Sequence, residues 1–235
     1  MKTYRVLKDI VFKTDAETGT PILTSQPLDD IDTLCLEYLI EQKQHGKTLH
    51  CLDIGGGAGK HAIRIAQAGH KATLIDRDDP SHYIQEVVDA GVIKSDQITL
   101  IQNQFNAIDV KKDLAPYDLI YSQRALNYMP YTELMAFMKE LTTYLPQGGR
   151  FYISVSGYDN EFGKSFPLRD KTLPERYGYV TDDMKIKHNI QDKTLVIKLE
   201  EMIDIMKELG YSILYTNVTT FGNVKLVGEK SLHIS

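Results

Sequence analysis

The amino-acid sequence predicts an α/β protein built on a mostly parallel sheet. From residue 49 onward, short apolar runs alternate with segments of helical periodicity, which is the pattern of repeated strand and helix units. A turn that is dense in glycine, Gly55 to Gly59, follows the first apolar run and leads into a helix. The 235 residues suffice for one such core but fall short of what two full domains usually need. We therefore expect one domain with additional segments.

Five apolar runs are the expected strands of the main sheet, at residues 50–54, 72–76, 98–102, 118–122 and 151–155. Helices are expected after Gly59, near Ser81 and near Tyr131, where apolar side chains recur at helical spacing. A last helix is expected to end at Gly210, because glycine commonly follows a helix end. The runs 211–218 and 224–228 flank a Phe-Gly-Asn segment and predict a β-hairpin.

Two regions stand outside this alternation. Residues 1–47 are expected to form an N-terminal helical extension, with Pro27-Leu28-Asp29-Asp30 as the start of a helix. The expected apolar face of that helix comprises Ile31, Leu34, Cys35, Tyr38 and Leu39. Residues 48–235 then form the main domain, and its segment 157–197 is too long for an ordinary connection. We expect this aromatic-rich insertion to be a lid over a binding site, with a dimer surface as the alternative.

Composition narrows the class of partner. Lysine and arginine number 27 against 32 acidic residues, so the net charge of −5 favours no polyanionic ligand. Cys35 and Cys51 lack metal or redox spacing and lie in apolar contexts, which indicates buried thiols in a reducing compartment. The first residues lack the apolar run of a signal peptide, and no stretch is apolar for long enough to span a bilayer. We expect a cytoplasmic protein with no membrane partner and no metal site.

Three glycine motifs compete for the segment that follows the first strand. A phosphate-binding loop requires glycine where Ile54 stands and serine or threonine where His61 stands, so this interpretation fails twice. A dinucleotide fingerprint requires its third glycine at Lys60, where a side chain hinders helix and strand packing. That interpretation is weak but stays open. What fits is Asp-x-Gly-x-Gly-x-Gly, formed by Asp53, Gly55, Gly57 and Gly59.

With this motif the chain resembles the class I S-adenosylmethionine-dependent methyltransferases. The resemblance is carried by five segments in order: Leu-Asp-Ile-Gly-Gly-Gly-Ala-Gly at 52–59, Thr-Leu-Ile-Asp at 73–76, residues 99–105, residues 117–128, and Leu-Pro-Gln-Gly-Gly-Arg-Phe at 145–151. It implies a Rossmann-like fold, a seven-stranded, mostly parallel sheet with an antiparallel last strand and helices on both faces. Residues 1–47 and 157–197 lie outside the resemblance.

The resemblance also implies the residues that bind the cofactor. They are the four motif residues Asp53, Gly55, Gly57 and Gly59, together with Asp76, Arg77, Gln104, Phe105, Ser122 and Gln123. Asp76 is placed to accept the two ribose hydroxyls, as acidic residues do in dinucleotide sites. Gln104 stands where the family often has aspartate, and its carbonyl oxygen can also accept from the adenine amino group. Phe105 is expected to stack on the adenine ring or contact its edge.

The segment after the fourth strand supplies the expected acceptor pocket, with Arg124, Asn127 and Tyr128 as candidates. It lacks the Asn or Asp-Pro-Pro-Tyr signature of the enzymes that methylate amino groups of nucleic acids. The expected function is therefore in-line methyl transfer from S-adenosylmethionine to a nitrogen, oxygen or other nucleophile of a small molecule. The sequence nominates no catalytic base and does not fix the oligomeric state.

Several alternatives stay open from the sequence. One is an NAD(P)-dependent Rossmann oxidoreductase, and another is a non-catalytic regulatory protein that binds S-adenosylmethionine. RNA or protein acceptors are a third possibility within the enzyme class, since the N-terminal helix and the insertion offer recognition surface.

Overall fold

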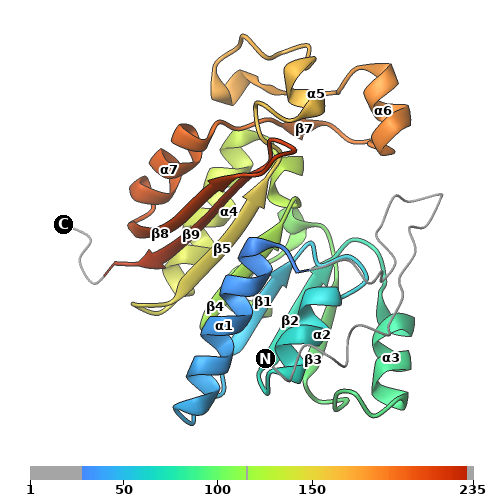
Figure 1. Cartoon of the computed structure of the whole chain (residues 1–235), viewed down its shortest axis with the longest axis vertical. Helices are drawn as coiled ribbons and strands as arrows, with labels where there is room; N and C mark the ends of the chain where they lie inside the picture. Colours follow the sequence, from blue (N-terminus) through green and yellow to red (C-terminus); the bar gives the residue numbers. More distant parts are fainter. Residues whose placement is uncertain (1–27, 115, 232–235) are drawn as a thin grey trace. The chain divides into compact units, whose positions relative to one another are not determined.

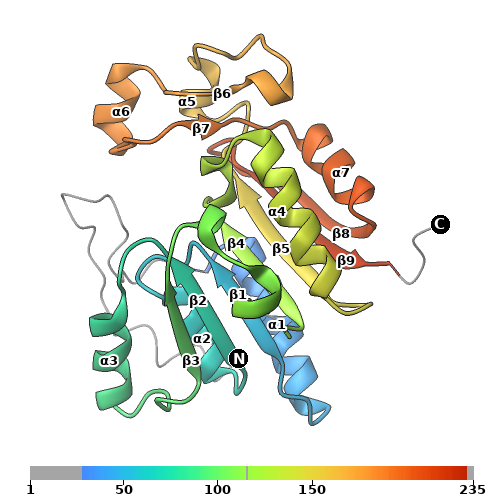
Figure 2. The ribbon, with the colours of Figure 1, turned by 180° about the vertical axis from the view of Figure 1, so that it is seen from behind.

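The computed structural model describes residues 28–114 and 116–231. It divides into two compact units, an N-terminal unit of Met1–Ala107 and a C-terminal unit of Ile108–Ser235. The elements of the N-terminal unit are α1 (Asp30–Gln44), β1 (His50–Ile54), α2 (Lys60–Gln67), β2 (Lys71–Asp76), α3 (Ser81–Asp89) and β3 (Ile98–Gln102). Strands β1, β2 and β3 are parallel, with Leu52 opposite Thr73 and Thr73 opposite Thr99. Figures 1 and 2 show α1 and α2 on the same face of these strands.

Helix α1 begins where the sequence predicts, but its buried face differs from the predicted one. Asp29 caps the helix, and Asp32 returns a hydrogen bond to the Asp29 backbone, which completes a capping box. Asp32 and Leu36 are buried, whereas the predicted Leu34 and Tyr38 are only half-buried. The cause lies in α2, which buries His61 and Arg64 and so offers polar partners to an aspartate on α1. Residues 1–27 of the predicted extension lie outside the described residues.

The C-terminal unit contains a second set of strands and helices. Its larger elements are β4 (Leu119–Gln123), α4 (Tyr131–Tyr144), β5 (Arg150–Val155), α7 (Leu199–Glu208), β8 (Tyr211–Val218) and β9 (Val224–Lys230). Strand β5 is parallel to β4, whereas β9 runs antiparallel to both β5 and β8. Helix α4 covers one face of β4 and β5, and α7 packs against β8 and β9 (Figure 2).

Together the strands form a seven-stranded sheet in the order β3-β2-β1-β4-β5-β9-β8. The predicted fold class is therefore confirmed, including the antiparallel last strand. Strands β1, β3 and β8 have the predicted bounds, while β4 lies one residue later than predicted and β9 continues to Lys230. Among the helices of residues 28–114 and 116–231, none combines the length and apolar character needed to cross a bilayer.

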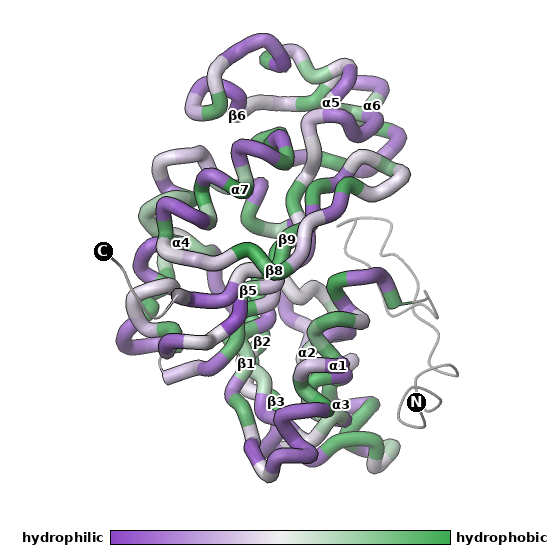
Figure 3. The backbone as a smooth tube through the Cα atoms, turned by 60° about the vertical axis from the view of Figure 1, so that its left-hand side comes forward, coloured by the Kyte–Doolittle hydropathy of each residue, from purple (hydrophilic) through white to green (hydrophobic). Residues whose placement is uncertain are grey.

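The insertion at residues 157–197 folds on a small core of its own. It contains α5 (Glu161–Lys164), β6 (Tyr177–Gly178), α6 (Asp182–His188) and β7 (Thr194–Leu195), with β6 and β7 paired antiparallel. Its ends meet at a bridge between Gly157 and Ile197. The buried side chains of its core are Phe166, Val180, Ile190 and Val196. Figure 3 shows short hydrophobic stretches within an insertion that is otherwise largely hydrophilic. This pattern fits a segment with one small hydrophobic core.

A buried arginine joins the insertion to α7. Arg176 is 2% exposed and donates from both terminal nitrogens to the Glu201 carboxylate, at 2.9 and 2.7 Å. It also donates to the Val196 carbonyl at 2.9 Å. Burial raises the pKa of Glu201, but the hydrogen bonds and charge of Arg176 outweigh burial and hold this pKa below its usual value. The pair is therefore charged at neutral pH.

We expect Arg176→Met to lower the free energy of unfolding by about 3 kcal/mol, because it leaves a partly buried carboxylate without its cation. The matched control is Arg150→Met, which breaks the more exposed pair of Arg150 with Glu229 and should cost less than about 1 kcal/mol. Urea unfolding measures both variants. Equal losses in the two would contradict the anchoring role of Arg176.

Candidate functional site

The glycine turn after β1 has a geometry that strongly favours glycine. Gly55, Gly57 and Gly59 adopt left-handed backbone angles, with φ of 69°, 53° and 80°. Gly56 is required for a different reason: a Cβ atom there would collide with Leu74 and would lie 2.6 Å from Asp53 Oδ2. The sequence motif does not single out Gly56, although the unbroken run of three glycines is a signal for it. The turn therefore lies directly on the Asp53 carboxylate.

Asp53 caps helix α2 from the neighbouring strand. The helix has Gly59 at its N-cap position and hence no capping side chain of its own. Asp53 Oδ2 instead accepts a hydrogen bond from the Ala62 backbone N–H at 2.9 Å. The side chain is 1% exposed. Burial raises the pKa of Asp53 to about 6, against the opposing effects of the His61 charge and the Ala62 amide.

Asp76 holds the same turn from β2. Its Oδ2 accepts from the Gly57 N–H at 2.8 Å, and its Oδ1 accepts from the Asp78 N–H at 3.1 Å. Burial raises the pKa of Asp76, and these two amides oppose the rise. Two strand-end carboxylates thus bind the segment from opposite ends: Asp53 contacts the helix start and Asp76 contacts the glycine turn. Arg77, the next residue, is exposed.

The candidates that follow β3 lie on a short turn. The Asn103 N–H donates to the Asp76 carbonyl at 2.9 Å, which ties this turn to the end of β2. Gln104 is exposed, and its backbone N–H donates to Asn103 Oδ1 at 2.9 Å. Phe105 is half-buried at the start of a 3-10 turn. The glycine turn therefore follows β1, and the Asp76 carboxylate lies at the end of β2. The Gln104 amide and the neighbouring Phe105 ring follow β3.

In the C-terminal unit, Ser122 is fully buried and Gln123 is half-buried. Arg124 follows them with an exposed side chain and a left-handed backbone angle, φ 54°. Its N–H donates to the Ser154 carbonyl at 2.8 Å, which fixes the turn against β5. Such an angle is costly for a residue other than glycine, and strained residues of this kind cluster at functional sites.

Asn127 and Tyr128 connect the segment after β4 to the insertion. Asn127 is fully buried, and its Nδ2 donates to Thr194 Oγ1 at 3.0 Å. The Tyr128 carbonyl accepts from the Tyr177 hydroxyl at 2.9 Å, while the Tyr128 ring is 40% exposed. Asn127 therefore contacts the insertion, and the acceptor role that we predict for it remains a prediction. Sequence reasoning missed Thr194 and Tyr177, because both lie far along the chain from their partners.

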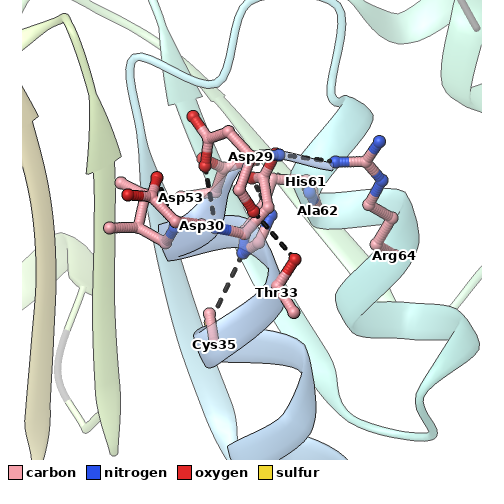
Figure 4. Close-up of polar contacts among 10 residues, drawn as sticks. Asp29, Asp30, Thr33, Cys35, Asp53, His61, Ala62 and Arg64 are labelled. Carbon is pink, nitrogen blue, oxygen red and sulfur yellow. Dashed lines mark hydrogen bonds and ion pairs between the residues drawn. The ribbon is translucent and has the colours of Figure 1, made fainter. Parts of the chain in front are cut away.

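A cluster of buried polar side chains lies beside Asp53, between α1 and α2 (Figure 4). It contains Asp32, Cys35, His61 and Arg64. Cys35 is buried, as its apolar context in the sequence predicts, whereas Asp32 and Arg64 are not among the predicted residues. The sequence does carry a signal for this cluster. Asp32 interrupts the apolar face of the first helix, and His61 and Arg64 lie one turn apart on the second.

Comparisons with known proteins identify the family of the chain. A family of methyltransferase domains matches residues 29–215 of the chain. The chain belongs to this family. The family prediction is thereby confirmed, and membership removes the support for an NAD(P)-dependent oxidoreductase.

One curated relative is the sterol 4-C-methyltransferase strm-1 of Caenorhabditis elegans, 28% identical over 139 residues. The match covers 58% of this chain but only 40% of that protein, so the chain spans less than half of the length of this relative.

Solved structures share the fold at low sequence identity. A 1,6-didemethyltoxoflavin-N1-methyltransferase of Burkholderia thailandensis, with bound 1,6-didemethyltoxoflavin and S-adenosylhomocysteine, is similar with a TM-score of 0.60 and 14% identity. That match covers 86% of this chain and 79% of the other. The magnesium protoporphyrin IX methyltransferase of Synechocystis PCC 6803, with bound SAM (S-adenosylmethionine), gives a TM-score of 0.57 and 16% identity, with 88% and 86% covered. At these identities the likeness supports the fold alone.

The raised pKa of Asp53 predicts how its substitution changes stability with pH. The folded protein holds the Asp53 proton between about pH 4 and pH 6, whereas the unfolded chain releases it near its ordinary pKa of 3.8. The contribution of Asp53 to stability therefore falls as the pH rises through this window. Relative to the wild type, Asp53→Asn should gain about 2.5 kcal/mol between pH 4 and pH 7.5.

Asp79→Asn is the matched control with the opposite sign. Asp79 is exposed, and its hydrogen bonds with Ser81 hold its pKa below the usual value. The stabilisation that the Asp79 carboxylate gives to the fold is present at neutral pH and is lost as the pH falls. Asp79→Asn should therefore be less stable than the wild type at pH 7.5. Urea unfolding at both pH values measures the two variants. If the free energies of unfolding of Asp53→Asn and the wild type differed by the same amount at both pH values, the raised pKa of Asp53 would be contradicted.

Proposed function

We propose that this protein transfers the methyl group of S-adenosylmethionine to a small-molecule acceptor. The observation that carries the proposal is the pair of strand-end carboxylates on the glycine turn. Asp76 binds the turn at Gly57, and Asp53 lies buried beneath it at the start of α2. Membership in the methyltransferase family supports the same conclusion.

The chemistry of these side chains fits the cofactor. A carboxylate offers about four lone-pair sites, so Asp76 can keep its two backbone donors and still accept from ribose hydroxyls. The negative charge of Asp53 favours the cationic methionine end of the cofactor. Gln104 supplies an exposed amide beside the half-buried Phe105 ring, and these groups suit an adenine amino group and an adenine face. Gly55, Gly57 and Gly59 let the ligand approach the main chain.

The residues of the C-terminal unit are proposed to serve the acceptor. The bound cofactor supplies an activated methyl group, and the protein has to align a nucleophile with it and exclude water. Ser122 and Gln123 are proposed to line the methionine end, and Arg124 and Tyr128 to face the acceptor. If the acceptor is an O–H or N–H group, it gives its proton to water or to a base.

The insertion is proposed to act as a lid. Two contacts support this role, because they join the insertion to the segment that follows β4: Asn127 with Thr194 and Tyr128 with Tyr177. Ligands of open α/β sheets bind at the carboxyl ends of the strands, which is where this segment begins. Asn127 then acts on the acceptor site indirectly, by holding β7.

The class of acceptor is inferred from the net charge of the chain and from the names of its relatives. The net charge of −5 favours no nucleic acid. The relatives named above are called methyltransferases of a sterol, of 1,6-didemethyltoxoflavin and of magnesium protoporphyrin IX, all of which are small molecules. A cytoplasmic location is proposed as well, since Cys35 and Cys51 are buried cysteines that are not joined in a disulfide. A non-catalytic protein that binds the cofactor is the competing proposal, and it would show no turnover with any acceptor.

Calorimetry with S-adenosylhomocysteine tests the cofactor. The wild type should bind it, and Asp76→Ala should weaken the affinity about 10- to 100-fold, because the variant loses charge-assisted hydrogen bonds to the ribose. Asp79→Ala removes a carboxylate three residues away and should keep the affinity within about twofold. Binding of NAD in place of S-adenosylhomocysteine, or equal affinities of Asp76→Ala and the wild type, would contradict the proposal.

A further inference from the structure

Arg124 follows β4 in a backbone conformation that favours glycine. Its φ is 54°, and within residues 28–114 and 116–231 Asn189 is the one other residue apart from glycine with a positive φ. Asn189 is the C-cap of α6, a position at which asparagine sometimes takes this conformation. Arg124 ends no helix, because it lies between β4 and a 3-10 turn. A glycine would avoid the strain, which indicates that the arginine side chain is itself needed here.

The backbone around Arg124 is held in place while its side chain reaches solvent. The Arg124 N–H donates to the Ser154 carbonyl of β5 at 2.8 Å. The next two residues, Ala125 and Leu126, are buried. The Arg124 side chain is exposed. The end of β4 therefore presents a guanidinium from a fixed turn.

Arg124 also differs from the other arginines of the C-terminal unit in its contacts. Each of the other three pairs with a carboxylate: Arg150 with Glu229, Arg169 with Asp159, and Arg176 with Glu201. Across the part of the chain that the structure describes, the Arg124 guanidinium has no hydrogen bond or ion pair. A guanidinium is a rigid fork of donors that matches a carboxylate or phosphate through two parallel hydrogen bonds. The fork of Arg124 is therefore available to an anionic ligand.

A row of polar residues crosses the strands beside Arg124. By register across β4, β5, β9 and β8, it comprises Gln123, Ser154, Lys225 and Asn217. Residues directly opposite one another share a face of the sheet. Hydroxyl, amide and ammonium groups make up this row, and none of its four members is acidic. Ligands of open α/β sheets bind at the carboxyl ends of the strands, and β4 ends at Gln123.

An aromatic ring lies four residues beyond Arg124. The Tyr128 ring is 40% exposed, and the Tyr177 hydroxyl holds the Tyr128 carbonyl at 2.9 Å. An aromatic face suits a planar apolar group. The segment after β4 thus offers a cationic fork and an aromatic ring within five residues of chain.

We propose that the methyl acceptor is a small molecule with a carboxylate or phosphate group, and that the Arg124 guanidinium binds this group. This role rests on the proposed function, because it assigns a chemical class to the acceptor of that reaction. Arg124 determines which acceptors bind and takes no part in the transfer of the methyl group. The need to place this side chain at the end of β4 explains the strained turn.

Binding of benzoate and phenyl phosphate to the complex with S-adenosylhomocysteine tests the proposal. Both probes join an anionic group to a planar ring, and benzamide is the neutral counterpart of benzoate. NMR titration should give a millimolar dissociation constant for at least one anion, and binding of benzamide should be at least about tenfold weaker. The stronger anion shows whether the site prefers a carboxylate or a phosphate. Equal binding of benzamide and the anions, or no binding of either anion at about 50 mM, overturns the proposal.

Substitution of Arg124 tests the assigned residue. Arg124→Gln should weaken binding of the anion at least about tenfold, because it removes charge-assisted hydrogen bonds. Arg124→Lys keeps the charge without the planar fork and should fall between Arg124→Gln and the wild type. Lys139→Gln is the matched control, since Lys139 is exposed on α4 and its loss changes the net charge equally. This control should stay within about twofold of the wild type. Equal losses in Lys139→Gln and Arg124→Gln would overturn the role of Arg124.

Arg124→Gly separates anion binding from folding. Glycine adopts a positive φ without strain, so Arg124→Gly should unfold at a higher urea concentration than Arg124→Gln. It should bind the anions as weakly as Arg124→Gln does. Anion binding that Arg124→Gly retains at the wild-type level would show that the side chain is not the anion's partner.

Calorimetry with S-adenosylhomocysteine distinguishes failure of this proposal from failure of the proposed function. Arg124→Gln should bind S-adenosylhomocysteine within about twofold of the wild-type affinity. A loss of about tenfold would show that Arg124 binds the carboxylate of the cofactor, which overturns its acceptor role and leaves the proposed function intact. If the wild type binds no S-adenosylhomocysteine, the proposed function fails and the acceptor role of Arg124 fails with it.

Discussion

The hydrogen bond from the Ala62 amide to the buried Asp53 carboxylate is the interaction on which the rest of the site depends. It joins the end of β1 to the start of α2 across a turn that has no side chain of its own to cap the helix. The bond fixes where the helix begins, and the glycine turn has to fit in the space above the carboxylate. A side chain at Gly56 would break this arrangement. The carboxylate and the glycines are therefore a single structural requirement.

Burying the Asp53 carboxylate costs free energy, and several contacts in the N-terminal unit offset this cost. The charge of His61 is the larger influence that lowers the pKa of Asp53, and the hydrogen bond from the Ala62 amide is the next. Asp32 contacts His61 and Arg64 together, so two acidic and two basic side chains lie within one buried region. This compensation is incomplete, because burial still outweighs the favourable contacts and raises the pKa of Asp53 to about 6. A cationic ligand above the turn would complete it, which connects the electrostatics of the fold to the proposed cofactor.

Local patterns predicted the elements of this protein well. The bounds of β1, β3 and β8, the helix that follows Gly59 and the start of α1 at Asp29 all follow from runs, turns and caps within a few residues of one another. Such signals depend on backbone preferences that a single sequence reveals. The resemblance to the family then supplied the seven strands of the sheet and the antiparallel direction of the last one, which local patterns do not determine.

Contacts between distant residues could not be predicted in the same way. Asp32 and Arg64 are separated by 32 residues, and their pairing rotates the buried face of α1 away from Leu34. Asn127 is buried because Thr194, 67 residues later, lies against it. The pair of Arg176 and Glu201 anchors the insertion, and no local pattern predicts that these two residues contact each other. These are the places where tertiary partners override periodicity.

The most direct test of the buried carboxylate is the number of protons released when S-adenosylhomocysteine binds at pH 6. Calorimetry in buffers of different ionisation enthalpy measures this number. With a pKa of about 6, Asp53 is about half protonated at this pH, and the ligand's ammonium group should drive the release of up to about half a proton. The wild type should show this release, and Asp53→Asn should show markedly less. Equal release from the two proteins would contradict the account.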